Sequence, residues 1–130
     1  MNDTEPKARL LVVDDDFDMT NTLKELLHDY DYEVDVAFDG VQALGKIKAK
    51  PYDAILCDYQ MPRMNGQVLF ETLVQSHPQA AERFIFITAN ARTPEVAQFF
   101  RVARVPVIEK PFRSAEVLHM VEKLLRSSTN

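Results

Sequence analysis

Three short stretches of this chain are apolar at every position, and each of them stops at a polar side chain. The stretches cover residues 10–13, 54–57 and 84–87, and they are followed by Asp14, Asp58 and Thr88. A strand with one wet face alternates apolar and polar residues, so a continuously apolar strand must be covered on both faces. The stretches therefore predict a buried parallel sheet of the α/β class.

Segments with helical periodicity separate these stretches. Apolar residues recur at helical spacing within residues 19–30, 41–47, 68–73, 96–103 and 117–125. Two more strands are expected, an alternating one at residues 34–38 and a short one at residues 105–108, and the central strand is expected at residues 53–57. Five strand–helix units with connections too long for hairpins predict a doubly wound parallel sheet with right-handed crossovers.

Local signals indicate where some helices begin and end. Asp39 followed by Gln42 is typical of a capping box, and Asn65 is a second candidate N-cap. Thr93 before Pro94 predicts a capping hydroxyl with proline at the first helical position. Pro78 is expected to stop the helix that follows Asn65.

Length and charge limit the classes of function. The chain has 130 residues and a formal net charge of −5, which predicts one domain over residues 1–130 with polar tails at about 1–8 and 127–130. An acidic domain is not expected to bind nucleic acid, and no apolar run approaches the ~18–20 residues that span a membrane. The polar N-terminus lacks a secretory signal, so we expect a cytoplasmic protein. The single cysteine, Cys57, is expected to be a buried apolar residue.

Polar side chains stand at the carboxyl ends of four predicted strands. Asp14 and Asp15 follow the first strand, Asp58 the third, Thr88 the fourth, and Lys110 the fifth. In open α/β sheets ligands bind outside these strand ends, so the side chains are expected to meet in one crevice.

Carboxylates that are crowded together repel one another unless cations compensate their charge. Lys110 supplies one positive charge, and Mg²⁺, which favours carboxylates, waters and phosphate oxygens, fits the rest. Such a site suits phosphoryl transfer, with Asp58 as the nucleophile that forms an acyl phosphate.

The same residues resemble a known family. Residues 11–16, the pair Cys57-Asp58 with residues 61–62 and 64–66, residues 87–89 and residues 110–112 are similar, in order, to the receiver domain of two-component response regulators. The resemblance covers nearly the whole chain. It implies a flavodoxin-like (βα)5 fold with strand order 2-1-3-4-5 and three α/β/α layers.

The resemblance also implies roles for individual residues. Asp58 would accept phosphate from a sensor histidine kinase, a phosphotransfer protein or a small acyl phosphate. Asp15 and Asp58 would bind Mg²⁺ (or Mn²⁺) directly, with the backbone carbonyl of Gln60 as a further ligand and Asp14 acting mainly through water. Thr88 and Lys110 would contact the phosphoryl group. The domain would assist its own phosphotransfer and autodephosphorylation rather than act as an enzyme.

Further expectations concern the peptide after the lysine and the output surface. The resemblance implies that the Lys110–Pro111 peptide is cis, although most X–Pro peptides in folded proteins are trans. The family usually carries an aromatic residue three positions before the lysine, where this chain has Val107. Phe99 and Phe100 on the fourth predicted helix suggest an exposed apolar patch. We therefore expect this helix and the fifth strand, with the last helix, to form the surface for a partner or a homodimer; the alternative is that both aromatics are core residues.

Two other classes of function fit parts of the pattern. Phosphohydrolases of the haloacid dehalogenase type also use Mg²⁺ and a nucleophilic Asp, but they place a second Asp where this chain has Gln60. A flavodoxin-like nucleotide or flavin binder would need a glycine-rich phosphate loop after the first strand, and none is present.

Overall fold

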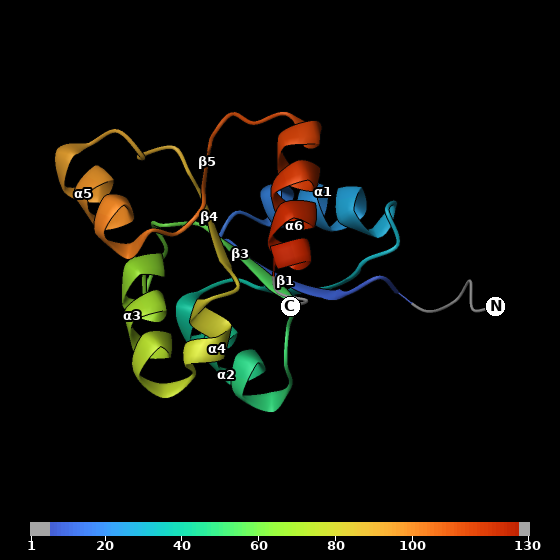
Figure 1. Cartoon of the computed structure of the whole chain (residues 1–130), viewed down its shortest axis with the longest axis horizontal. Coiled ribbons are helices and arrows are strands. Elements are labelled where there is room, and N and C mark those ends of the chain that lie inside the picture. The colour runs from blue at the N-terminus through green and yellow to red at the C-terminus, as the bar shows by residue number, and fades with distance from the viewer. Residues whose placement is uncertain (1–5, 128–130) are drawn as a thin grey trace.

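The computed structural model describes residues 6–127. The elements follow one another in the order β1 (Arg9–Val13), α1 (Phe17–His28), β2 (Glu33–Ala37), α2 (Gly40–Ala49), β3 (Ala54–Cys57), α3 (Gly66–Ser76), α4 (Pro78–Ala81), β4 (Phe84–Thr88), α5 (Pro94–Ala103), β5 (Val107–Glu109) and α6 (Ser114–Ser127). Figure 1 shows the helices arranged around a central sheet.

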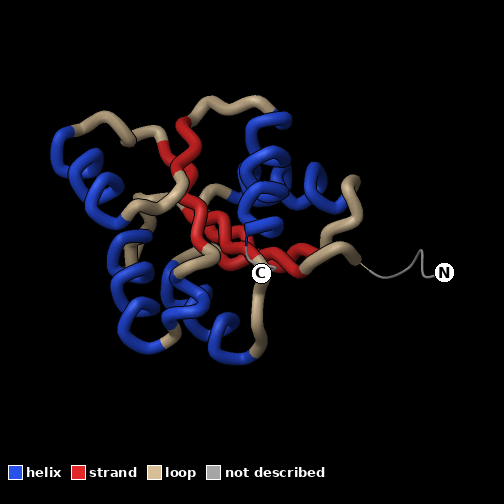
Figure 2. Tube along the Cα trace, in the orientation of Figure 1, coloured by secondary structure: helices blue, strands red, loops and turns tan. Residues whose placement is uncertain are grey.

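The sheet is parallel, with its strands in the order β2-β1-β3-β4-β5. Figure 2 shows the strands together in the middle of the molecule, with helices on either side. Helices α1 and α6 contribute buried residues to the core on one face, whereas α2, α3, α4 and α5 contribute to the core on the other. The predicted class, strand order and three-layer arrangement are confirmed.

Coverage on both faces explains the apolar strands. In β1, Leu11 and Val13 pack into the core that faces α2 to α5, whereas Leu10 and Val12 pack into the core that faces α1 and α6. Successive side chains of a strand point to opposite faces, so each of the four buried positions after Arg9 needs an apolar residue. Cys57 is fully buried at the end of β3, as expected.

Several predicted bounds differ from the structure. β2 ends at Ala37, because Phe38 leaves the sheet and stacks on Phe17. β3 begins at Ala54 rather than at residue 53, and β5 occupies Val107–Glu109 rather than residues 105–108. Pro78 does end the preceding helix, but it also starts the short helix α4, since proline is tolerated at the first helical position.

The capping predictions were partly right. The Asp39 carboxylate accepts a hydrogen bond from the Gln42 N–H, and the Asn65 side chain accepts one from Val68. Thr93 is the N-cap residue of α5 and Pro94 is its first residue, as predicted. Only the capping hydrogen bond was predicted wrongly, because the Thr93 hydroxyl donates to the Asn90 carbonyl at 3.3 Å instead of accepting from the helix. Among residues 6–127, no helix has the length and apolarity needed to cross a bilayer.

Candidate functional site

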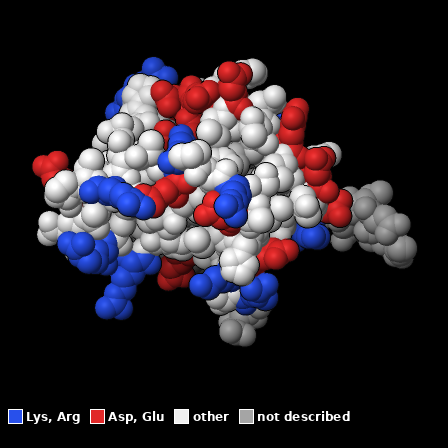
Figure 3. Space-filling view, turned by 90° about the horizontal axis from the view of Figure 1, so that it is seen from above, with Lys and Arg blue, Asp and Glu red and all other residues white. Residues whose placement is uncertain are grey.

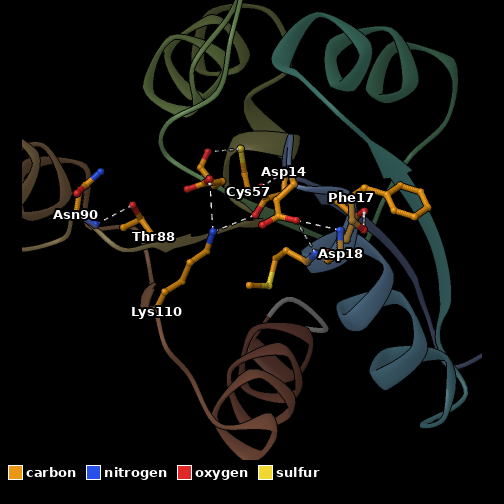
Figure 4. Close-up of polar contacts among 11 residues, drawn as sticks. Asp14, Phe17, Asp18, Cys57, Thr88, Asn90 and Lys110 are labelled. Atoms are coloured by element: carbon orange, nitrogen blue, oxygen red, sulfur yellow. Dashed lines mark hydrogen bonds and ion pairs between the residues drawn. The ribbon is translucent and has the colours of Figure 1, made fainter.

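The candidate site lies where four parallel strands end. Val13 pairs with Cys57 and Thr88 pairs with Glu109, so the residues that follow these strands share one edge of the sheet. Asp14, Asp58 and Lys110 each come directly after a strand, and Thr88 is the last residue of β4. Figure 4 shows the Lys110 side chain reaching from its own strand end toward Asp14.

Three carboxylates meet at this edge. One oxygen from each of Asp14, Asp15 and Asp58 lies within 4.8 Å of the others. Asp14 is buried, Asp58 is partly buried and Asp15 is exposed. The Asp58 N–H donates to the Val13 carbonyl at 2.9 Å, which ties the start of the Asp58 loop to the end of β1. The predicted convergence of these carboxylates is confirmed.

Lys110 bridges two of the carboxylates. Its Nζ lies 3.1 Å from Oδ2 of Asp14 and 3.5 Å from Oδ2 of Asp58. The backbone N–H of Lys110 donates to the Thr88 carbonyl at 2.9 Å, so the last pair of strands positions the base of the side chain. The Lys110–Pro111 peptide is cis, as predicted.

The electrostatics of the pocket favour additional positive charge. Burial, reinforced by the nearby Asp14 carboxylate, raises the pKa of Asp58 from 3.8 to about 6, although Lys110 and the Gln60 N–H oppose the shift. Burial likewise raises the pKa of Asp14. The pKa of Lys110 is also raised: burial acts to lower it, but the attraction of Asp58 and Asp14 prevails. One ammonium therefore does not neutralise the negative charge of the pocket.

The donor set fits a hard divalent cation. Because Mg²⁺–O distances are about 2.0–2.1 Å, two oxygens on one ion lie at most about 4.2 Å apart. The carboxylate oxygens of Asp14, Asp15 and Asp58, within 4.8 Å of one another, need only a small closure to share an ion. The Gln60 N–H lies near enough to the Asp58 carboxylate to lower its pKa, so the Gln60 backbone borders the site.

Thr88 lies at the same edge but makes a different contact. Its side chain is fully buried, and its hydroxyl accepts a hydrogen bond from the Asn90 N–H at 3.2 Å. In Figure 4 the Thr88 hydroxyl is directed toward Asn90 and away from Lys110. Any contact between this hydroxyl and a group on Asp58 therefore requires the hydroxyl to reorient.

The residues predicted for the output surface lie apart from the carboxylates. Phe100 is buried and Phe99 is partly buried, and both rings pack in the core beside Phe86. The expectation of an exposed Phe99–Phe100 patch is therefore corrected: both rings pack against the other aromatic residues of the core. Val102 is the α5 residue with a highly exposed apolar side chain, at 74%. Val107 is partly buried on β5.

Two residues near the site were missed by the sequence analysis. Tyr59, directly after Asp58, packs its ring against Phe99 and Phe100. Arg63, in the loop after Asp58, donates from Nε to the buried Asp39 carboxylate at 3.0 Å and so links this loop to the start of α2. Only the position of Tyr59, next to the candidate nucleophile, could have drawn attention to it.

The surroundings of the site are mixed in charge. Figure 3 looks onto the molecule from above, and acidic and basic side chains both occur across this face, so neither sign covers it alone. A cavity of about 590 Å³ lies elsewhere, at the amino ends of β3 and β4, where Lys48, Tyr52 and His77 contribute to its lining. The chemistry of the carboxylates is therefore separate from this cavity.

Comparisons with known proteins agree with this geometry. The family described as response regulator receiver domain matches residues 10–122. The transcriptional regulatory protein DltR of Streptococcus agalactiae is 31% identical over 121 residues, which cover 93% of this chain and 53% of that protein. The transcriptional regulatory protein CpxR of Escherichia coli is 32% identical over 120 residues, which cover 92% of this chain and 50% of that protein.

A solved structure is also similar to this chain over nearly the whole length of the chain. The receiver domain of the Francisella response regulator 1452 has a TM-score of 0.84 and 26% identity, covering 95% of this chain and all of that one. The present chain spans about half the length of the curated relatives named above.

Proposed function

We propose a signalling function for this chain, because it belongs to the family of response regulator receiver domains. In this proposal residues 1–130 form a single receiver domain whose phosphoacceptor is Asp58. The donor is a sensor histidine kinase, a phosphotransfer protein or a small acyl phosphate. The domain acts in the cytoplasm as a switch that promotes its own phosphotransfer and autodephosphorylation.

The observation that carries the proposal is the crowded pocket around Asp58. Its carboxylate lies beside Asp14, Asp15 and the Lys110 ammonium, and its pKa is about 6. At neutral pH most of the Asp58 side chains are ionised, and an ionised carboxylate can act as a nucleophile. Nearby positive charge favours a phosphoryl group as it is transferred.

The reaction can be described from the residues of this chain. An Asp58 carboxylate oxygen attacks the phosphorus of the donor, a P–O bond to Asp58 forms, and the bond to the donor nitrogen or oxygen breaks. Asp14, Asp15, Asp58 and the Gln60 carbonyl would hold Mg²⁺ or Mn²⁺, which would supply charge neutralisation for the phosphoryl oxygens.

Lys110 and Thr88 act on the product. The Lys110 ammonium, already 3.5 Å from Asp58, pairs with a phosphoryl oxygen. The Thr88 hydroxyl gives up its hydrogen bond with the Asn90 N–H and donates to another phosphoryl oxygen. These movements shift the population of conformations at α5 and β5.

The output of the switch is a change in protein contacts. The surface formed by α5, β5 and α6, with Phe99, Phe100 and Val107 behind it, would bind a partner or a second copy of this chain. Val102, an exposed apolar residue of α5, supports the assignment of this surface as a binding surface. We propose no nucleic-acid binding by this domain and no membrane contact, since the net charge is −5.

Incubation with acetyl phosphate and Mg²⁺ tests this function. The wild-type chain should gain one acid-labile phosphoryl group, measured by intact mass, and Asp58→Asn should gain none. Asp18→Asn is the matched control, because Asp18 is an exposed acid outside the carboxylate cluster. Uptake of a phosphoryl group by Asp58→Asn, or continuous turnover of acetyl phosphate as in a phosphohydrolase, would contradict the proposal.

A further inference from the structure

An aromatic cluster joins the loop after β3 to α5. It consists of Tyr59, Phe70, Phe84, Phe86, Phe99 and Phe100. Figure 1 shows α5 at the edge of the molecule beside the upper end of α3. The cluster brings together rings from α5, α3, β4 and the loop after β3. The position of α5 therefore depends on how the rings pack.

Tyr59 is the member of the cluster that lies next to the proposed phosphoacceptor. Its ring centroid lies 5.9 Å from that of Phe99, 5.7 Å from that of Phe100 and 6.1 Å from that of Phe86. The Tyr59 ring thus contacts α5 and β4 together, while its backbone continues directly from Asp58.

The backbone of Tyr59 is held tightly. Its carbonyl accepts a hydrogen bond from the Gly66 N–H at 2.8 Å. A Cβ placed on Gly66 would lie 2.5 Å from the Asp58 carbonyl oxygen and 2.7 Å from a ring carbon of Phe86, so no free space remains there. A movement of the Asp58–Tyr59 backbone is therefore not absorbed locally.

The hydroxyl end of Tyr59 is anchored as well. It donates to Oε1 of Gln67 on α3 at 2.5 Å, and the Gln67 amide donates to Glu71 at 3.2 Å. The Tyr59 hydroxyl is thus bonded to α3, while the ring packs against Phe99 and Phe100 of α5. A tilt of the ring must change the packing of Phe99 and Phe100.

From these contacts we infer that Tyr59 is a positioning residue that couples the chemical state of Asp58 to the position of α5. This inference rests on the proposed function, since it needs Asp58 to be phosphorylated. The coupling runs through ring packing, and the Tyr59 hydroxyl restrains the ring without being essential. Tyr59 takes no part in the phosphoryl transfer itself.

Hydrogen–deuterium exchange of residues 94–103 before and after phosphorylation with acetyl phosphate and Mg²⁺ tests the inference. The wild-type chain should show a change in α5 on phosphorylation. In Tyr59→Leu, Asp58 should still be phosphorylated, but the equilibrium constant for the α5 change should fall by about two- to thirtyfold, the range for coupling through packed side chains. Tyr59→Phe should retain the response.

Two further variants separate coupling from general packing. Phe99→Leu breaks the same contact from the side of α5 and should reduce the response as Tyr59→Leu does, which also covers the case that Tyr59→Leu does not fold. Phe70→Leu is the matched control, because Phe70 packs in the same cluster against Phe84, Phe86 and Phe99. Within the described residues, the ring of Tyr59 pairs with Phe86, Phe99 and Phe100 and not with Phe70. It should keep most of the response.

The outcomes are distinguishable. A wild-type chain that takes up no phosphoryl group overturns the proposed function and this inference with it. A chain that is phosphorylated and still shows a full α5 response in both Tyr59→Leu and Phe99→Leu overturns the inference alone. An equal loss in Phe70→Leu would also overturn it, because the response would then depend on the bulk of the cluster.

Discussion

At the scale of single residues, Asp58 is both the proposed nucleophile and a carboxylate whose surroundings disfavour its charged form. Asp58 has a pKa raised from 3.8 to about 6, mainly by burial and then by Asp14. Between these pH values the folded chain binds more protons at Asp58 than the unfolded chain does. This side chain therefore lowers the free energy of unfolding as pH rises through that window.

Replacing Asp58 should consequently stabilise the metal-free protein. We expect Asp58→Asn to raise the free energy of unfolding at pH 7 by about 1–3 kcal/mol, and to have a much smaller effect at pH 4, where the folded carboxyl is protonated. Urea unfolding in EDTA at both pH values measures this, with Asp18→Asn as the exposed control. Equal stability of Asp58→Asn and wild type at pH 7 would contradict the electrostatic description.

Lys110 should influence the same titration in the opposite direction. Its Nζ lies 3.5 Å from Asp58 and acts to lower the carboxyl pKa. In Lys110→Gln the pKa of Asp58 should rise above the wild-type value, and phosphorylation at neutral pH should become slower because less carboxylate is available. An NMR titration of the Asp58 carboxyl carbon measures this pKa. Arg113→Gln, which removes a positive charge at an exposed position, is the control. An unchanged or lower pKa would show that Lys110 does not compensate Asp58.

At the scale of elements, the junction between the Asp58 loop and α3 requires a glycine. Gly66 is the first residue of α3, and a Cβ there would lie 2.5 Å from the Asp58 carbonyl oxygen. Gly45 lies inside α2, and a Cβ there would have no neighbour within 4 Å. The two glycines form a natural matched pair.

Alanine should have opposite effects at these two glycines. Gly66→Ala should lower the free energy of unfolding by about 1–3 kcal/mol because the backbone of Asp58 must move. Gly45→Ala should raise it by about 0.5–1 kcal/mol, since alanine favours a helix interior. Thermal and urea unfolding measure both. A neutral Gly66→Ala would mean that the loop has more room than its contacts indicate.

At the scale of the whole molecule, the sequence predicted the fold and most of the site because one pattern determines both. Apolar strands required a buried parallel sheet, and a parallel sheet necessarily brings Asp14, Asp58 and Lys110 to one edge. The tertiary contacts were not predictable in the same way. Phe99 and Phe100 pack against the ring of Tyr59, a contact that the sequence pattern does not reveal. The Thr93 hydroxyl donates to the Asn90 carbonyl instead of capping the helix.

Metal binding also involves the whole pocket, since the candidate ligands come from two distant segments of the chain, one after β1 and one after β3. Mg²⁺ should stabilise the folded wild-type chain by about 2.7 kcal/mol at a concentration one hundred times its dissociation constant. Asp15→Asn should lose much of this gain without a loss of stability in EDTA, because Asp15 is exposed. Thermal unfolding with Mg²⁺ against NaCl of equal ionic strength measures the effect. Equal stabilisation of the variant would exclude Asp15 as a ligand.

The acidic pocket should direct a phosphoryl group from the donor to Asp58 and to no other carboxylate. Borohydride reduces an aspartyl phosphate to homoserine, so treatment after incubation with acetyl phosphate and Mg²⁺, followed by peptide mass spectrometry, identifies the modified residue. We expect homoserine at position 58 and a strong decrease in its yield when EDTA replaces Mg²⁺. Homoserine at position 14 or 15 instead, or no homoserine at position 58, would contradict it.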